Sequence, residues 1–348
     1  MEAELQAIAW HLPAATLTNE QLARDYPDWP VEKIRGKTGI ECRHVSAHSE
    51  CASDLVVEAA RKLFAQDVCR PSDIDFVLFC TQSPDYFLPA TACLLQHRLG
   101  IPTSAGAFDL NMGCSGFVYS LGVASGLIQS GQARKVLLLT GETMTKYVRE
   151  DDRGVRTLFG DGGAATLIGA VTGHSQTERP RLGPFVYGTD GGGADHLIVR
   201  EGGFRAAASN GQSPGQKNLY MNGPEVFTFT LRTVPHCLDQ LLSRAGLTQA
   251  DVDLFVFHQA NGYMLEHLRQ KCRIPPEKYF IGMQRIGNTA SASIPIALHQ
   301  AARQHRMKPG ACVAVLGFGV GFSWAGTLIR WPERLGGLEA EPEERRCA

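Results

Sequence analysis

The chain has 348 residues, of which 44% are hydrophobic and 20% charged, and its formal net charge is −1. These values predict a globular α/β protein with a large core, and the lack of a basic tract argues against nucleic acid as a partner. No secretion signal or membrane-spanning run is evident. The ten cysteines form no C-x-x-C pair, which argues against a zinc site and against a disulfide framework. We therefore expect the reducing environment of the cytoplasm.

Strand and helix patterns alternate along the first hundred residues. The near-continuous apolar run DFVLFCT at residues 75–81 is typical of a strand that is buried on both faces. The helices are predicted from apolar spacing and from capping residues, such as Thr18 or Asn19 for the first. The other elements expected here are a strand at 5–11, helices at 19–25, 53–65 and 89–99, and a basic, glycine-containing turn region at 29–44.

The stretch AFDLNMGCSGFVYSLGVASGLIQSG at residues 107–131 is predicted to organise the chain. A short strand ends near Asn111, a turn follows, and small and apolar residues continue at helical spacing from Cys114 to Gly131. A cysteine at the start of a helix meets unpaired N–H groups and partial positive charge, which favour the thiolate. Cys114 is therefore a candidate nucleophile, although a lone buried cysteine is more often inert packing.

After this helix the pattern predicts a strand at 135–140, a loop at 142–159 and a returning strand at 160–169. Residues 172–222 are rich in Gly, Ser, Pro and Asn, which indicates a linker with surface insertions.

The second half of the sequence repeats the first. The segment SDIDFVLF at 72–79 aligns with ADVDLFVF at 250–257, and the later strands at 135–141 and 164–169 align with 312–318 and 325–330. In this alignment Cys114 corresponds to Asn288, and His258 follows the strand equivalent to the one that ends at Cys80. We therefore expect two pseudo-symmetric halves, at 1–171 and 223–333, joined by the linker at 172–222 and followed by a polar tail at 334–348.

Five motifs in order resemble the β-ketoacyl-acyl-carrier-protein synthase III family. They are N-M-G-C-S-G around Cys114, F-G-D-G at 159–162, H-Q-A-N from His258, G-N-T-A-S-A-S around Asn288 and G-F-G-V-G-F-S-W at 317–324. The resemblance covers nearly the whole chain and implies the thiolase fold, with two βαβαβ halves in a five-layered αβαβα core. It also implies a catalytic set of Cys114, His258 and Asn288.

The resemblance implies a two-step reaction. An acyl group passes from a thioester to Cys114, and the backbone N–H groups of Cys114 and Gly319 form the oxyanion hole. A malonyl thioester or a β-ketoacyl thioester then supplies the carbon nucleophile, and His258 and Asn288 stabilise the enolate oxygen. Thiolysis is disfavoured because the second cysteine of a thiolase is missing from the turn at 319–321. Plant-like type III polyketide synthases usually have proline where this chain has Val320.

The substrate-binding residues depart from the family pattern. Lys37 replaces an arginine and Lys33 a tryptophan of the coenzyme A site, so a stacking platform is expected to be missing, while Arg153 and Asn261 match family contacts to the nucleotide and the pantetheine arm. Tyr263 replaces an arginine that guides the carrier protein, which leaves a reduced carrier-protein patch. Its expected members are Arg232, Tyr263 and Lys271, with Arg269 nearby.

Leu88 replaces the bulky phenylalanine with which the family often closes the acyl tunnel from the partner subunit. We therefore expect a specialised cytoplasmic homodimer with no permanent cofactor or metal, which uses acyl-coenzyme A or acyl-carrier-protein thioesters, including longer donors. Two alternatives remain open at this point. The acyl group can pass to a hydroxyl, amine or other non-malonyl nucleophile, or the chain can be a non-catalytic subunit that binds acyl chains.

Overall fold

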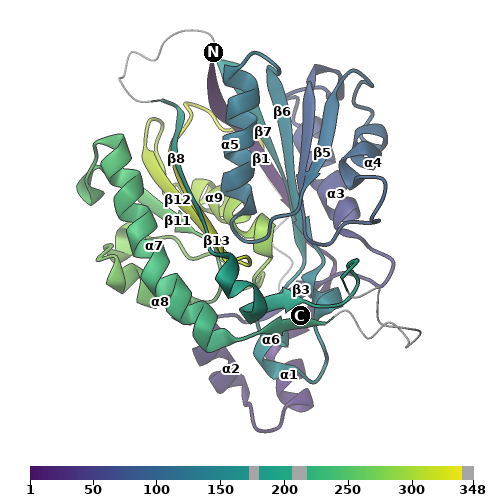
Figure 1. Ribbon diagram of the computed structural model, residues 1–348, viewed down its shortest axis with the longest axis vertical. Helices are drawn as coiled ribbons and strands as arrows, with labels where there is room; N and C mark the ends of the chain where they lie inside the picture. The colour runs from purple at the N-terminus through teal and green to yellow at the C-terminus, as the bar shows by residue number, and fades with distance from the viewer. Residues whose placement is uncertain (172–179, 206–217, 339–348) are drawn as a thin grey trace.

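Two β-sheets with matching strand order form the frame of the molecule, in a computed structural model that describes residues 1–171, 180–205 and 218–338 (Figure 1). The first sheet has the order β1-β7-β6-β4-β5 and the second the order β11-β12-β13-β8. The strands of the first sheet are β1 (Glu2–His11), β4 (Phe76–Cys80), β5 (Gly106–Leu110), β6 (Lys135–Glu142) and β7 (Gly162–Val171). Those of the second are β8 (Leu182–Thr189), β11 (Leu254–Phe257), β12 (Cys312–Gly319) and β13 (Ser323–Arg330).

The strand registers confirm the predicted repeat. Phe76 of β4 pairs in parallel with Val136 of β6, and Leu254 of β11 pairs in parallel with Val313 of β12. The β6–β7 and β12–β13 pairs are both antiparallel, as are β1–β7 and β13–β8. In place of a partner equivalent to β5, β11 has an isolated parallel bridge from Phe255 to Tyr279.

Helices cover each face of the two sheets and complete five layers (Figure 1). The central layer is formed by α5 (Gly116–Gln129) and α9 (Ser293–Arg303), whose buried side chains pack in one core with both sheets. The outer face of the first sheet packs on α3 (Ala52–Ala65) and α4 (Thr91–Arg98). The outer face of the second packs on α7 (Gly223–Ala245) and α8 (Gly262–Lys271). The predicted αβαβα arrangement is confirmed.

The remaining elements lie at one end of the sheets or on their surface. They are β2 (Ala15–Thr18), α1 (Asn19–Asp25), α2 (Val31–Thr38), β3 (Cys42–Val45), α6 (Arg153–Arg156), β9 (Leu197–Val199) and β10 (Leu219–Met221). Helix α1 begins with a capping box, in which Thr18 Oγ1 accepts from the Gln21 amide and Gln21 Oε1 accepts from the Thr18 amide. None of the helices in the described residues is long and apolar enough to cross a membrane.

Several element predictions need correction. The region 29–44 is not a turn: it contains α2 and β3, because Pro30 fixes an extended backbone before the helix and Gly39, with φ of 67°, ends it. Part of the predicted linker forms β8, which takes the place of β1 in the second half. The start of the predicted polar tail is ordered, since Leu335 is buried and Gly336 exchanges backbone hydrogen bonds with β1. The domain boundaries stay predictions, and residues 172–179, 206–217 and 339–348 lie outside the described residues.

Close contact between β12 and the start of α5 joins the two halves. A Cβ atom on Gly317 would lie 2.7 Å from Ser115 Cα and 2.8 Å from the Cys114 carbonyl oxygen. Ser115 Oγ also lies 2.7 Å from Ser323 Oγ, which donates to the Val320 carbonyl. The absence of a side chain at Gly317 therefore lets the second half rest directly on the turn that carries Cys114.

This contact predicts a stability difference between two alanine substitutions. Gly317→Ala should lower the free energy of unfolding by about 1–3 kcal/mol, because the methyl group meets backbone atoms that have nowhere to move. Gly126→Ala in α5 is the matched control, since its Cβ would enter open space, and it should be neutral or stabilising by up to about 1 kcal/mol. Urea denaturation of both variants measures the difference. Equal stability of the two would show that β12 and the turn do not touch as described.

Candidate active site

Cys114 lies in the turn between β5 and α5 and is 8% exposed. Helix α5 begins at Gly116 with Ser115 at the N-cap position, so the cysteine precedes the helix by two residues rather than lying within its first turn. Asn288 likewise precedes the 3-10 turn η6 (Ala290–Ala292) by two residues. The expected equivalence of Cys114 and Asn288 in the two halves is therefore reproduced by the local structure.

The end of β12 brings the nucleophile turn and His258 together. A Cβ atom on Gly319 would lie 2.9 Å from Cys114 Cβ and 3.1 Å from its Sγ, so the Gly319 backbone directly faces the thiol. On the same strand, the Leu316 carbonyl accepts a hydrogen bond from the His258 amide at 2.8 Å. The Phe318 ring meets the imidazole edge to face, with 5.5 Å between their centroids.

His258 follows β11 and is 1% exposed. Its Nδ1 lies 2.7 Å from Ser293 Oγ, and that oxygen accepts a hydrogen bond from the Gln259 amide. The serine hydroxyl hydrogen is then available for Nδ1, so we assign the imidazole hydrogen to Nε2. Burial lowers the pKa of His258 to about 3, which keeps the ring neutral. A neutral ring with hydrogen on Nε2 is a hydrogen-bond donor without a charge.

Asn288 is 5% exposed, and its backbone is fixed by the F-G-D-G segment and the residue before it. The Asn288 amide donates to the Leu158 carbonyl at 2.9 Å, and the Asn288 carbonyl accepts from Gly160 at 3.1 Å. Its side-chain Oδ1 accepts from the Ala290 amide at 2.9 Å. That contact orients the carboxamide, so the two hydrogens on Nδ2 are the ones that can be donated in hydrogen bonds to a substrate.

The thiol of Cys114 is protonated in this environment, contrary to the expectation from its position before a helix. Burial, followed by the charge of Glu142, raises the pKa of Cys114 to about 12. Glu142 ends β6, is fully buried and has a pKa that burial raises to about 7. Desolvation of the closed site therefore outweighs the helix start, and the thiol must lose its proton as it reacts.

A cleft of about 790 Å³ opens beside this centre, and its lining includes Gln82, Asn111, Met144 and Val320. Gln82 and Val320 also border Gly113, the residue before the nucleophile. A Cβ atom on Gly113 would lie 2.4 Å from Gln82 Oε1 and 2.8 Å from Val320 Cγ1. The cleft therefore borders the residue that directly precedes Cys114.

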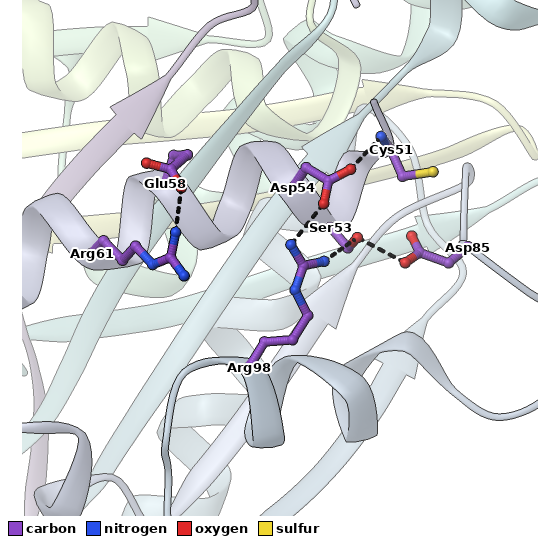
Figure 2. Close-up of polar contacts among 7 residues, drawn as sticks. All are labelled: Cys51, Ser53, Asp54, Glu58, Arg61, Asp85 and Arg98. Atoms are coloured by element: carbon purple, nitrogen blue, oxygen red, sulfur yellow. Dashed lines mark hydrogen bonds and ion pairs between the residues drawn. The ribbon is translucent and has the colours of Figure 1, made fainter. Parts of the chain in front are cut away.

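One wall of the cleft is a loop that carries Asp85. Ser53 of α3 contacts this loop, and Arg98 of α4 contacts Ser53 in turn (Figure 2). Buried Ser53 donates to Asp85 Oδ2 at 2.7 Å and accepts from Arg98 at 2.8 Å. Arg98 also pairs with Asp54, whose other oxygen accepts from the Cys51 amide at the start of α3. The first sheet's outer helices therefore fix the wall of the cleft.

A cationic group with an aromatic ring lies on the surface formed by α2 and α6. The Trp29 ring centroid is 5.5 Å from Lys33 Nζ, 5.7 Å from Lys37 Nζ and 5.3 Å from Arg153 Cζ. Lys33 and Lys37 share one face of α2 because they are four residues apart. Trp29, just before the N-cap Pro30, supplies an aromatic ring beside Lys37 and Arg153, a ring that the expectation of a missing stacking platform did not consider.

The other predicted binding residues lie outside the buried centre. Asn261 caps α8, where its Oδ1 accepts from the Met264 amide at 2.8 Å. Tyr263 is exposed and packs on His267 and on Phe227 of α7. Arg232 lies 4.0 Å from Asp190, and Lys271 is exposed at the end of α8. Arg269 is bound to Glu266, which leaves less free positive charge than the sequence suggested.

Leu88 is 85% exposed in the single chain, next to the exposed rings of Tyr86 and Phe87.

The sequence patterns gave no role to three other residues at the site, which are Glu142, Ser293 and Trp29. Glu142 was recognisable as a carboxylate that ends an apolar strand, and Ser293 lies within the G-N-T-A-S-A-S motif. The comparison of motifs overlooked Trp29, because Trp29 lies four residues before the position where the family has its tryptophan.

Comparison with known proteins agrees with this geometry. The model of 3-oxoacyl-[acyl-carrier-protein] synthase III matches residues 108–191, and the model of its C-terminal part matches residues 242–331. A β-ketoacyl-[acyl-carrier-protein] synthase III of Caldanaerobacter subterraneus is 36% identical over 324 residues, which cover 92% of this chain and 95% of that protein.

Two solved structures extend the similarity. A crystal structure of a 3-oxoacyl-(acyl-carrier-protein) synthase III is 50% identical, with a TM-score of 0.90, over 95% of this chain and all of the other. The priming β-ketosynthase of the R1128 polyketide pathway is 30% identical, with a TM-score of 0.86, over 95% of this chain and 96% of the other. The chain therefore belongs to the 3-oxoacyl-[acyl-carrier-protein] synthase III family, whose members are condensing acyltransferases.

Proposed function

We propose that this enzyme loads an acyl group from a thioester onto Cys114 and condenses it with a malonyl or β-ketoacyl thioester. The observation that carries the proposal is the close approach of the end of β12 both to the buried Cys114 thiol and to the neutral imidazole of His258. The oriented carboxamide of Asn288, in the turn equivalent to that of Cys114, is proposed to complete the set. A neutral donor pair suits an oxygen on which negative charge develops, and a buried thiol suits covalent catalysis.

In the first step, Cys114 sulfur attacks the carbonyl carbon of the acyl thioester. The carbonyl oxygen becomes an oxyanion, which the backbone N–H groups of Cys114 and Gly319 stabilise. The carbon–sulfur bond to the carrier then breaks, and the proton from the Cys114 thiol ends on the departing carrier thiol. Because burial raises the pKa of the thiol to about 12, transfer of this proton is part of the loading step.

In the second step, the malonyl thioester loses carbon dioxide and leaves an enolate. The Nε2 hydrogen of His258 and an Nδ2 hydrogen of Asn288 bind the enolate oxygen as its charge grows. The enolate carbon attacks the acyl group on Cys114, and the bond from the acyl carbon to the sulfur breaks as the new carbon–carbon bond forms. The departing thiolate then takes a proton from water, which restores the resting thiol. The product is a β-ketoacyl thioester, and no permanently bound cofactor takes part in this sequence.

Coenzyme A is supported as one donor carrier by the surface around Trp29. A purine can stack on an indole ring, and Lys33, Lys37 and Arg153 provide positive charge for phosphate groups. Asn261 is proposed to contact the pantetheine arm. Acyl carrier protein is proposed as a partner at Arg232, Tyr263 and Lys271. Arg232 lies 4.0 Å from Asp190 and Tyr263 packs on His267, whereas Lys271 is exposed at the end of α8.

A homodimer is proposed from the exposed edge of the first sheet, and a cytoplasmic location stays a proposal from the sequence. Strand β5 is the edge strand, and in the described residues no other strand pairs with its outer side. Phe108 on that strand and the nearby Tyr86, Phe87 and Leu88 are exposed apolar residues. A second copy that covers this face would bring Leu88 to the partner's cleft, where a leucine in place of phenylalanine leaves room for longer acyl chains.

Acylation of Cys114 is the direct test of the function. Intact-protein mass spectrometry after mixing with acyl-coenzyme A thioesters of increasing length should show one acyl adduct, and Cys114→Ala should abolish it. Cys80→Ala is the control, because Cys80 is also buried and lies nearby but should not carry the adduct. An adduct that persists in Cys114→Ala would refute the assignment. The mass of the adduct identifies the preferred donor.

The donor pair should affect the two half-reactions differently. His258→Ala and Asn288→Ala should each slow decarboxylation of a malonyl thioester by about 10²-fold or more, because each removes a donor to the enolate oxygen. Loading of Cys114 should be less affected, since its oxyanion uses backbone donors. Release of labelled carbon dioxide and the rate of adduct formation measure the two steps separately. Unchanged decarboxylation in both variants would favour a non-malonyl acceptor.

The Trp29 surface predicts a carrier-dependent defect. Trp29→Ala should raise KM for an acyl-coenzyme A donor by about 5- to 150-fold, because a stacked and cation-flanked ring contributes about 1–3 kcal/mol to base binding. The same acyl group on N-acetylcysteamine lacks the nucleotide and serves as the control substrate, with unchanged KM. An equal defect with both donors would show that Trp29 supports the fold of α2 instead of the nucleotide.

A further inference from the structure

The buried carboxylate of Glu142 has no part in the two-step reaction above, yet it lies where both halves of the molecule meet. Glu142 is 0% exposed at the end of β6, a strand of the first sheet. Four donors surround it. They are the Gln82 amide at 3.1 and 3.0 Å from its two oxygens, Ser83 Oγ at 2.9 Å, Thr81 Oγ1 at 3.4 Å and Ser291 Oγ at 2.9 Å.

These donors come from two different segments. Thr81, Gln82 and Ser83 follow β4 in the first half and lead into the wall of the cleft. Ser291 belongs to η6 in the second half, three residues after Asn288. A buried carboxylate needs such donors to be tolerated, so Glu142 fixes the position of both segments at once.

The turn that carries Asn288 needs an external anchor. Ala290 has φ of 45°, a left-handed conformation that is costly for a residue with a side chain. N-terminal to Ala290, the turn is held by the backbone contacts of Asn288 with Leu158 and Gly160. C-terminal to Ala290, Ser291 Oγ donates to Glu142 and lies 3.4 Å from the Cys80 carbonyl oxygen.

We propose that Glu142 is a positioning residue, which through Ser291 locks the turn that presents Asn288 to the acylated nucleophile. The inference rests on the proposed role of Asn288 in the condensation. Glu142 contacts the Asn288 turn through the Ser291 hydroxyl, and it contacts the segment after β4 through two hydroxyls and one backbone amide. The two connections can therefore be removed separately. Loss of the Ser291 connection lets Asn288 move, and a displacement of about 1 Å in a catalytic group is enough to slow a reaction substantially.

Ser291→Ala tests this role with Ser83→Ala as the matched control. Each variant removes one hydroxyl from the same carboxylate, but only Ser291 belongs to the Asn288 turn. Ser291→Ala should lower malonyl decarboxylation by about 10-fold while Cys114 loading stays within about twofold of the wild type. Ser83→Ala should not separate the two half-reactions. An equal loss of decarboxylation in both variants, or a loss of loading as large as that of decarboxylation in Ser291→Ala, would overturn the proposal.

A double-mutant cycle shows whether the effect passes through Asn288. In the Asn288→Ala background, Ser291→Ala should cause little further loss of decarboxylation, because the group that it positions is already absent. A further 10-fold loss would contradict the proposal. If Asn288→Ala leaves decarboxylation unchanged, the proposed function fails. If Asn288→Ala slows it and Ser291→Ala does not, only the role of Glu142 fails. Should Ser291→Ala unfold below the assay temperature, Ser291→Cys, which nearly keeps the side-chain volume but donates only weakly to Glu142, replaces it and should give a loss with the same selectivity.

Discussion

The site depends on the close approach of β12 to the turn at Cys114, which glycines at positions 317 and 319 permit. Any side chain at Gly317 would enter the backbone of Ser115, and a side chain at Gly319 would meet the sulfur of Cys114. The strand therefore lies directly against the nucleophile instead of a side chain's width away. Because the same strand end binds the His258 amide and packs on its ring, one element sets the distance between nucleophile and donor.

Desolvation is the second constraint, and it acts differently on each ionisable group. It raises the pKa of the Cys114 thiol and of the Glu142 carboxyl, and it lowers that of His258. A neutral imidazole suits a donor that must bind an enolate oxygen without trapping it as a strong ion pair. A protonated thiol suits a nucleophile that should react only when a thioester fills the cleft. Burial thus gives the resting site low charge at the places where charge develops during the reaction.

The pseudo-twofold repeat explains why the catalytic set comes from both halves. Cys114 and Asn288 occupy equivalent turns before the two central helices, and His258 occupies the position that Cys80 has in the first half. The repeat places these turns near a common axis, but it does not by itself align their side chains. Alignment depends on contacts that the repeat does not share, such as Ser293 with His258 and Ser291 with Glu142.

The sequence by itself determined the repeat of two halves and, with the family resemblance, the candidate residues Cys114, His258 and Asn288. Hydrophobic runs and small-residue helices are local patterns, and the repeat made their spacing readable. Only the tertiary structure decided the role of β8, the helix in the region 29–44, the aromatic and cationic surface at Trp29 and the buried contacts of Glu142. These features join segments that lie far apart in the chain, and the energy of such contacts depends on burial and distance, which no local pattern of residues records.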